Sequence, residues 1–179
     1  SLISKIPAKN RLADFPHYLM HRAEQLENLY IFTNTEGTPE NIRKFHPNII
    51  VSSTGSAPLL PPIAGLKDRI DNEDYNIYSI LGMINHINDF PKDLEGKKVV
   101  VVGGGAVGLD VVEFFADRNA DISIVEMMDQ IGRDLDPVSK NDTKAMMKKH
   151  NVHQLTKTAL LEVKDSSFLV RGDGEPYEL

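Results

Sequence analysis

A glycine-rich run near the middle of the chain has the composition and spacing that phosphate binding requires. Its six residues match the pattern G-x-G-x-x-G and are Gly103, Gly104, Gly105, Ala106, Val107 and Gly108. Gly103 permits a tight turn, Gly105 lets a diphosphate approach the backbone, and Gly108 allows a following helix to pack closely. The run directly follows the β-branched residues 99–102 and precedes a helical pattern, so we predict a dinucleotide site at a helix N-terminus. The alternative is a glycine-rich strand-to-helix turn that binds no ligand.

A carboxylate follows at the distance expected for a ribose ligand. Glu126 stands 18 positions after Gly108 (126 minus 108), close to the spacing of about 20 residues in dinucleotide sites. It would accept hydrogen bonds from the adenine-ribose hydroxyls and repel the 2′-phosphate of NADP. Met127 and Met128 offer no cation for that phosphate, and the nearest arginine is Arg133. The sequence therefore favours NAD(H) over NADP(H); the alternative for Glu126 is a solvated carboxylate at a strand end.

Two other groups of polar residues have chemically suggestive positions. Asp110 lies in the first turn of the predicted dinucleotide helix, where it either acts at the nicotinamide end of the ligand or only stabilises the helix dipole. His17 and His21 have the i, i+4 spacing of a metal pair. They lack an acidic third ligand in register nearby, so we expect surface histidines and no metal site.

The elements that position the glycine run are predicted by hydrophobic periodicity. We expect buried strands at 99–102 and 122–125, a helix over 106–118 that buries Val107, Val111, Val112 and Phe115, and a second helix over 136–149. Short strands at 159–163, 168–171 and 176–179 indicate an antiparallel meander. The fold class is α/β: a three-layer, Rossmann-type dinucleotide-binding domain with a short β-meander.

The preceding half of the chain is predicted to hold a helix at 15–26, a β-rich run at 29–33, a helix start at Thr38-Pro39 and a buried strand at 48–52. Three prolines within 58–65 exclude a helix or central strand there. One further helix is expected at 77–87. We therefore divide the chain into a partial FAD-binding segment (1–60), a connection with a helix (61–96) and an NAD(P)-binding domain (97–179).

Composition excludes several classes of protein. The chain has 179 residues, a net charge of −6 and no cysteine, with 41% hydrophobic and 26% charged residues. The negative charge argues against a nucleic-acid surface. No apolar run reaches the roughly 18 residues of a membrane span, and the start shows no signal-peptide pattern. We expect a cytoplasmic protein without a membrane partner, and the sequence leaves open whether it forms a homo-oligomer.

The order of these motifs carries a family resemblance. Residues 49–58, Ile-Ile-Val-Ser-Ser-Thr-Gly-Ser-Ala-Pro, resemble the "ATGxxP" strand and turn of flavoproteins with two dinucleotide domains. The Pro-Pro-Ile-Ala-Gly run at 61–65 resembles their "PPIPG" segment. Residues 97–134 are similar to the NAD-binding insert of the 2,4-dienoyl-CoA reductase, enoate reductase and NADH:flavin oxidoreductase family. Thr54 and Gly55 then correspond to a turn near FAD, although a simple β-turn explains them equally well.

The resemblance implies that the chain is a segment of a larger enzyme. The family has a flavin-bearing (β/α)8 barrel with FMN and an iron–sulfur cluster, followed by an FAD domain with its own glycine-rich unit, and this sequence has neither. In such a parent, NADH reduces FAD, and electrons pass to the second flavin to reduce an activated C=C bond. The rest of that flavoenzyme would be the partner of this segment, which alone would be catalytically incomplete.

Two other classes stay open. The chain also fits a segment of another pyridine-nucleotide flavoprotein, such as a disulfide reductase or NADH oxidase. Disulfide reductases usually carry Glu at the position of Asp110, which favours the dienoyl-CoA reductase side. A non-enzymatic NADH-sensing module is the third class, and it would need an adjacent DNA- or partner-binding domain.

Overall fold

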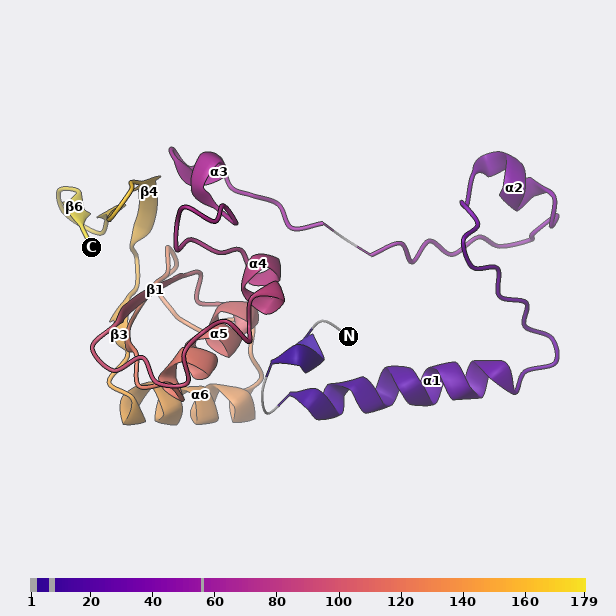
Figure 1. Ribbon diagram of the computed structural model, residues 1–179, viewed down its shortest axis with the longest axis horizontal. Coiled ribbons are helices and arrows are strands. Elements are labelled where there is room, and N and C mark those ends of the chain that lie inside the picture. Colours follow the sequence, from indigo (N-terminus) through magenta and orange to yellow (C-terminus); the bar gives the residue numbers. More distant parts are fainter. Residues whose placement is uncertain (1–2, 7–8, 56) are drawn as a thin grey trace.

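The computed structural model describes residues 3–6, 9–55 and 57–179. It has two parts (Figure 1). A body holds both β-sheets, and an arm carrying α1 (Asp14–Glu24) and α2 (Pro39–Arg43) stands away from it. Ser56, which belongs to the segment that resembles the flavoprotein turn, lies outside the described residues.

The centre of the body is a parallel sheet in the order β1-β2-β3. Its strands are β1 (Lys98–Val102), β2 (Asp121–Val125) and β3 (His153–Leu155), connected by α5 (Ala106–Ala116) and α6 (Pro137–Lys149). The two crossovers run in the same direction across the sheet, so right-handed connections place both helices on one face. This arrangement confirms the predicted α/β, Rossmann-type fold.

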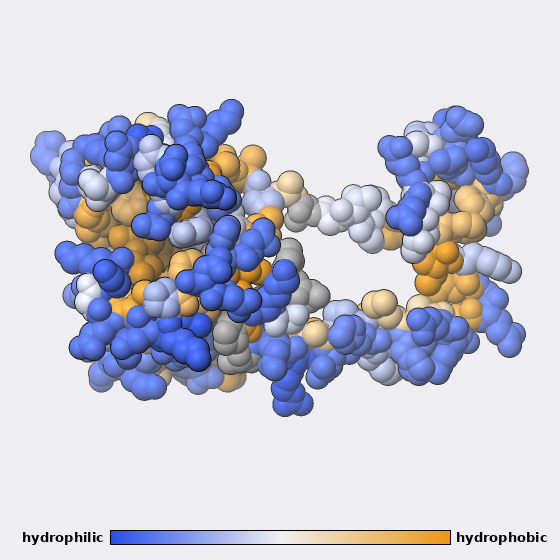
Figure 2. All heavy atoms as spheres, in the orientation of Figure 1, coloured by the Kyte–Doolittle hydropathy of each residue, from blue (hydrophilic) through white to orange (hydrophobic). Residues whose placement is uncertain are grey.

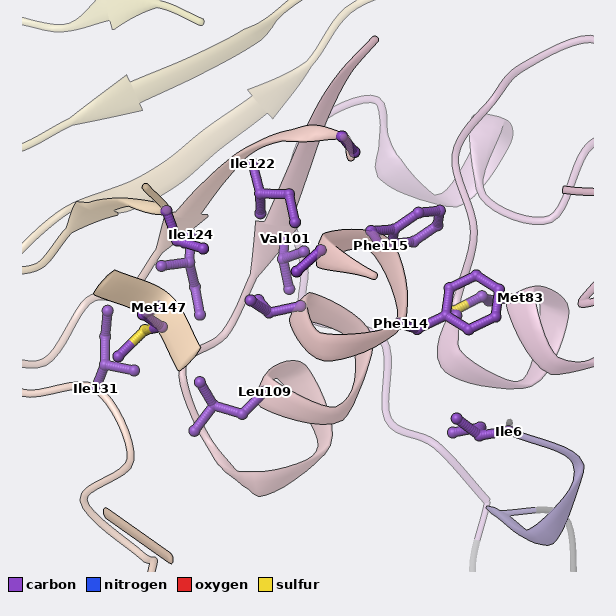
Figure 3. Packing of buried hydrophobic residues seen from close by; sticks show 14 of the residues in the cluster. Ile6, Met83, Val101, Leu109, Phe114, Phe115, Ile122, Ile124, Ile131 and Met147 are labelled. Atoms are coloured by element: carbon purple, nitrogen blue, oxygen red, sulfur yellow. The ribbon is translucent and has the colours of Figure 1, made fainter. Parts of the chain in front are cut away.

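The core lies between that face of the sheet and the two helices (Figure 3). Val101 of β1 pairs in register with Ile124 of β2, and both side chains point to α5, where Val112 and Phe115 are also buried. Because successive strand residues alternate between faces, Val102 points to the opposite face and is 49% exposed. The prediction of a buried strand at 99–102 therefore holds for Val101 but not for Val102.

Helix α5 begins as predicted but ends at Ala116, before the expected residue 118. Its buried face includes Leu109, Val112 and Phe115, whereas Val107 is 56% exposed. Val107 is two residues before Leu109, and residues two apart on a helix do not share a face. The prediction that Val107 is buried is therefore wrong.

The C-terminal strands form the predicted antiparallel meander: β4 (Ala159–Val163), β5 (Phe168–Arg171) and β6 (Tyr177–Glu178). An isolated parallel bridge joins Ala64 to Glu162 of β4. Beside it, the guanidinium of Arg69, in α3 (Leu66–Arg69), binds the carboxylate of Asp165 at 2.6 Å. The proline-rich connection is therefore tied to the meander where it reaches the body.

Residues 61–96 contribute directly to the core. The expected helix at 77–87 is shorter, α4 (Ile80–Asn85), and the side chain of Ser79 caps it by accepting from the amide of Gly82. Met83 and Ile84 of this helix are buried. Ile6, which follows the 3-10 helix η1 (Ile3–Lys5), joins the same cluster and is only 3% exposed. Ile6 is thus packed against the body.

The described residues of the arm form helices but no strands. The 3-10 helix η2 (Asn10–Ala13) leads into α1, and Thr38 caps α2 as the Thr-Pro pair predicts. The strands expected at 29–33 and 48–52 are wrong: these segments are irregular, and Ile49 and Val51 are about four-fifths exposed, at 81% and 80%. A strand requires a hydrogen-bonded neighbour, and the described residues supply none here. Their apolar side chains contribute to the exposed hydrophobic surface of the arm (Figure 2).

Across the described parts of the chain, none of the helices has the length and apolar character needed to span a membrane.

Candidate dinucleotide-binding site

The glycine run forms the turn between β1 and α5. Gly103 has a φ of 104° and donates its N–H to the carbonyl of Val125 in the neighbouring strand, at 2.8 Å. A Cβ added to Gly108 would lie 1.9 Å from the carbonyl oxygen of Gly103. The first glycine therefore supplies a backbone conformation that favours glycine, and the last permits the helix to pack against the turn.

Glu126 lies against this turn. Its Oε2 accepts the N–H of Gly104 at 2.6 Å, and its Oε1 accepts the N–H of Met128 at 2.7 Å. The structure thus brings the glycine run and Glu126 together, as the sequence predicts. The carboxylate is held by backbone amides at the end of β2, which makes it more than a freely solvated strand-end charge.

The loop between β2 and α6 also contacts the turn. Gly132 donates its N–H to the carbonyl of Gly104 at 2.7 Å, and Ala106 donates its N–H to Oδ2 of Asp134 at 3.2 Å. A Cβ added to Gly105 would lie 3.4 Å from the same carboxylate oxygen. Asp134 is not among the residues predicted from the sequence, because no spacing rule marks a loop carboxylate that meets a helix N-terminus 28 residues before it.

These groups line an open pocket of about 380 Å³. Its lining residues are Gly104, Gly105, Glu126, Met128, Gln130, Arg133 and Asp134. The guanidinium of Arg133 therefore shares a pocket with the carboxylate expected to repel a 2′-phosphate. Met127 is 72% exposed and is absent from this lining.

Asp110 lies in a different hollow, of about 350 Å³, between α5 and α6. Its carboxylate pairs with the ammonium of Lys9, which also lies 3.6 Å from Glu113. Burial lowers the pKa of Lys9, but the hydrogen bond and charge of Asp110, together with Glu113, outweigh it, so the pKa is raised. Asp110 is therefore the ion-pair partner of the N-terminal segment.

Other candidate residues lie outside both hollows. Thr54 and Gly55 are exposed, outside any helix or strand, and line neither pocket. His17 and His21 are exposed on α1, where His21 lies 3.1 Å from the amide of Gln25. Among the described residues, no three His, Asp or Glu side chains form a group able to hold a metal.

A comparison with known solved structures agrees with this fold. The 2-naphthoyl-CoA reductase in complex with 2-naphthoyl-CoA has a similar fold, with a TM-score of 0.72 and 22% identity, over 99% of this chain and 25% of that one.

The chain also matches curated relatives. It is 30% identical to the NADH oxidase of Thermoanaerobacter brockii over 124 residues, which cover 69% of this chain and 18% of the relative. It is 24% identical to the bilirubin reductase of Mediterraneibacter gnavus over 167 residues, which cover 93% of this chain and 24% of that one. The chain thus spans less than a quarter of the length of these two relatives. Residues 26–179 match the family model for pyridine nucleotide-disulphide oxidoreductases, and the chain belongs to that family.

Proposed function

We propose that the chain binds NAD(H) at the β1–α5 turn and is the dinucleotide-binding segment of a flavin-dependent oxidoreductase. The observation that carries the proposal is the placement of the Glu126 carboxylate on the amide of Gly104, at 2.6 Å, within the pocket that Gly105, the N-cap of α5, also lines. Backbone N–H groups at a helix start suit a diphosphate, and an adjacent carboxylate suits ribose hydroxyls.

The residues present fit this ligand. A Cβ on Gly104 would crowd Ile131 and Glu126, at 3.1 and 3.2 Å, so a side chain does not fit there. At Gly105 the missing side chain would let a diphosphate approach the backbone. Gly103, Ala106, Val107 and Gly108 would shape the turn, and Met127 would border the adenine end. When bound, the nicotinamide supplies a hydride for a flavin, and this chain's residues bind and orient it.

Selectivity for NAD(H) over NADP(H) rests on a balance of two charges. Glu126 would repel a 2′-phosphate, whereas Arg133 in the same pocket would attract it. We assign the dominant effect to Glu126, because two backbone amides fix its carboxylate. Arg133, by contrast, is exposed.

For the parent protein, we propose a flavoenzyme of the enoate or dienoyl-CoA reductase type that reduces an activated C=C bond through FAD and a second flavin. The similarity to a bilirubin reductase and a naphthoyl-CoA reductase supports this assignment, as does Asp rather than Glu at position 110. The chain has no cysteine to ligate an iron–sulfur cluster, so that cluster would belong to another part of the parent. The FMN would lie in the barrel that the proposed family assignment implies. An NADH oxidase is the second candidate, favoured by the relative at 30% identity.

The arm would be completed by the rest of the parent flavoenzyme. In this proposal residues 1–60 belong to the FAD-binding domain, 61–96 connect it to the NAD domain, and 97–179 form that domain. The apolar side chains of Ile49 and Val51 are exposed on an irregular segment with strand-forming composition. They would become strand residues against FAD-domain neighbours, which would bring Thr54 and Gly55 to the flavin.

The test is a fluorescence titration of the chain with NADH and with NADPH, using the wild type, Glu126→Gln, Glu126→Arg and Arg133→Met. NADH should bind the wild type at least about tenfold more tightly than NADPH, and Glu126→Arg should reverse that preference. Glu126→Gln should weaken the preference for NADH. Arg133→Met should weaken the binding of NADPH more than the binding of NADH. Failure of the wild type to bind either nucleotide would contradict the proposal.

A further inference from the structure

We propose that Asp134 is a built-in competitor for the diphosphate: its carboxylate takes the ligand's place at the α5 N-terminus and must swing away on binding. The inference rests on the proposed function and adds a residue that controls affinity at the same site. It rests on one contact: the Asp134 carboxylate accepts the N–H of Ala106 at 3.2 Å and lies directly over Gly105.

The position of the carboxylate matches what a phosphate oxygen needs. Ala106 is the first residue of an 11-residue helix, so its N–H has no acceptor within the helix. A Cβ on Gly105 would make ordinary contact with Oδ2 of Asp134, at 3.4 Å. The carboxylate therefore covers the glycine whose missing side chain gives a diphosphate access to the backbone.

Because both are anions, the Asp134 carboxylate and a diphosphate cannot occupy the α5 N-terminus at the same time. The partial positive charge of the α5 N-terminus stabilises one anion near its first amides, whether a carboxylate or a phosphate. Placing both there would bring like charges into contact in a pocket that already contains the carboxylate of Glu126. Binding therefore requires the aspartate to leave.

In the loop between β2 and α6, only the side chain of Asp134 has to move when a ligand binds. Its backbone is tied to the turn by the 2.7 Å bond from Gly132 N–H to the Gly104 carbonyl, and Leu135 N–H donates back to Gly132 at 3.1 Å. Asp134 itself is exposed, and within the described residues its carboxylate accepts one hydrogen bond. By contrast, Glu126 accepts two and stays in place as the ribose ligand.

The experiment measures the Kd of NADH and of ADP-ribose for the wild type, Asp134→Asn, Asp134→Ala and the control Asp129→Asn. Asp129 is exposed in the same loop and does not line the pocket, and Asp129→Asn changes the net charge by the same amount as the Asp134 variants. Both Asp134 variants should bind each ligand about threefold to fivefold more tightly, the size of a helix-terminus charge effect, and the control should stay within about twofold of the wild type.

The outcomes separate this inference from the proposed function. If the wild type binds neither ligand, the proposed function fails. If it binds and the Asp134 variants bind equally or more weakly, or the control gains as much, the competitor role is wrong and Asp134 only caps the helix. Thermal unfolding without nucleotide adds a readout: a cap alone lowers Tm in Asp134→Ala without tightening binding.

Discussion

Replacing Gly108 by alanine tests the packing of the glycine turn most severely. A Cβ at this position would lie 1.9 Å from the carbonyl oxygen of Gly103 and 3.0 Å from its carbonyl carbon. Reaching ordinary contact at 3.4 Å would require a displacement of about 1.5 Å between α5 and the turn. Both elements are backbone held by the sheet, so a rotamer change gives no relief. We expect a loss of about 3 kcal/mol in the free energy of unfolding.

Thermal unfolding followed by circular dichroism measures this effect. For a chain of this length, that loss lowers Tm by about 10 °C. Gly174→Ala is the matched control, because a Cβ there meets nothing within 4 Å and the residue lacks a positive φ; its Tm should stay within about 2 °C of the wild type. A Gly108→Ala variant as stable as this control would refute the account of the turn.

Three further predictions follow from the same contacts. Gly105→Ala should leave Tm nearly unchanged, since its Cβ makes an ordinary 3.4 Å contact, yet weaken NADH binding about tenfold in a fluorescence titration; equal losses of stability and binding would contradict this. Ile6→Ala should cost about 3 kcal/mol in denaturant unfolding, because the side chain is 3% exposed within the core; a loss below about 1 kcal/mol would mean that Ile6 is not packed there. Hydrogen bonds from the hydroxyl of Ser139 and, to a lesser degree, from the amides of Ser139 and Val138 lower the pKa of Asp136 below its ordinary 3.8. The Asp136 cap therefore stabilises α6 above that pH, and the stabilisation is lost as the pH falls through the lowered pKa. In acid titrations, the wild type should therefore lose its stability advantage over Asp136→Ala in that window, and an advantage that persists at lower pH would exclude this linkage.

Local signals in the sequence were sufficient to predict most helices and strands of residues 97–179. The glycine run, the start of the helix predicted over 136–149 and the meander depend on neighbouring residues or on alternation within a few positions, and the structure has them as expected. Strand β3 (His153–Leu155) was not anticipated because it is short and two of its three residues are polar. Its pairing with β2 depends on the register that α6 imposes.

The remaining differences have long-range causes. Residues 29–33 and 48–52 have strand composition, but composition does not provide the hydrogen-bonded neighbours that make a strand. The pairing of Lys9 with Asp110 spans 101 positions, and the bond from Ala106 to Asp134 spans 28. Such contacts follow from how helices and loops pack, which single-residue patterns do not encode.

The central claim is that NAD(H) binds at the β1–α5 turn, and amide chemical shifts of the 15N-labelled chain test it directly. On addition of NADH, the account predicts the largest shifts at Gly105 and Ala106, at the helix start where the diphosphate should bind, and a shift at Gly104, whose N–H donates to the ribose ligand Glu126. Smaller shifts are expected at Met128, which donates to Glu126. Saturating NADH that leaves these amides unchanged, or shifts only residues of the arm, would contradict the claim.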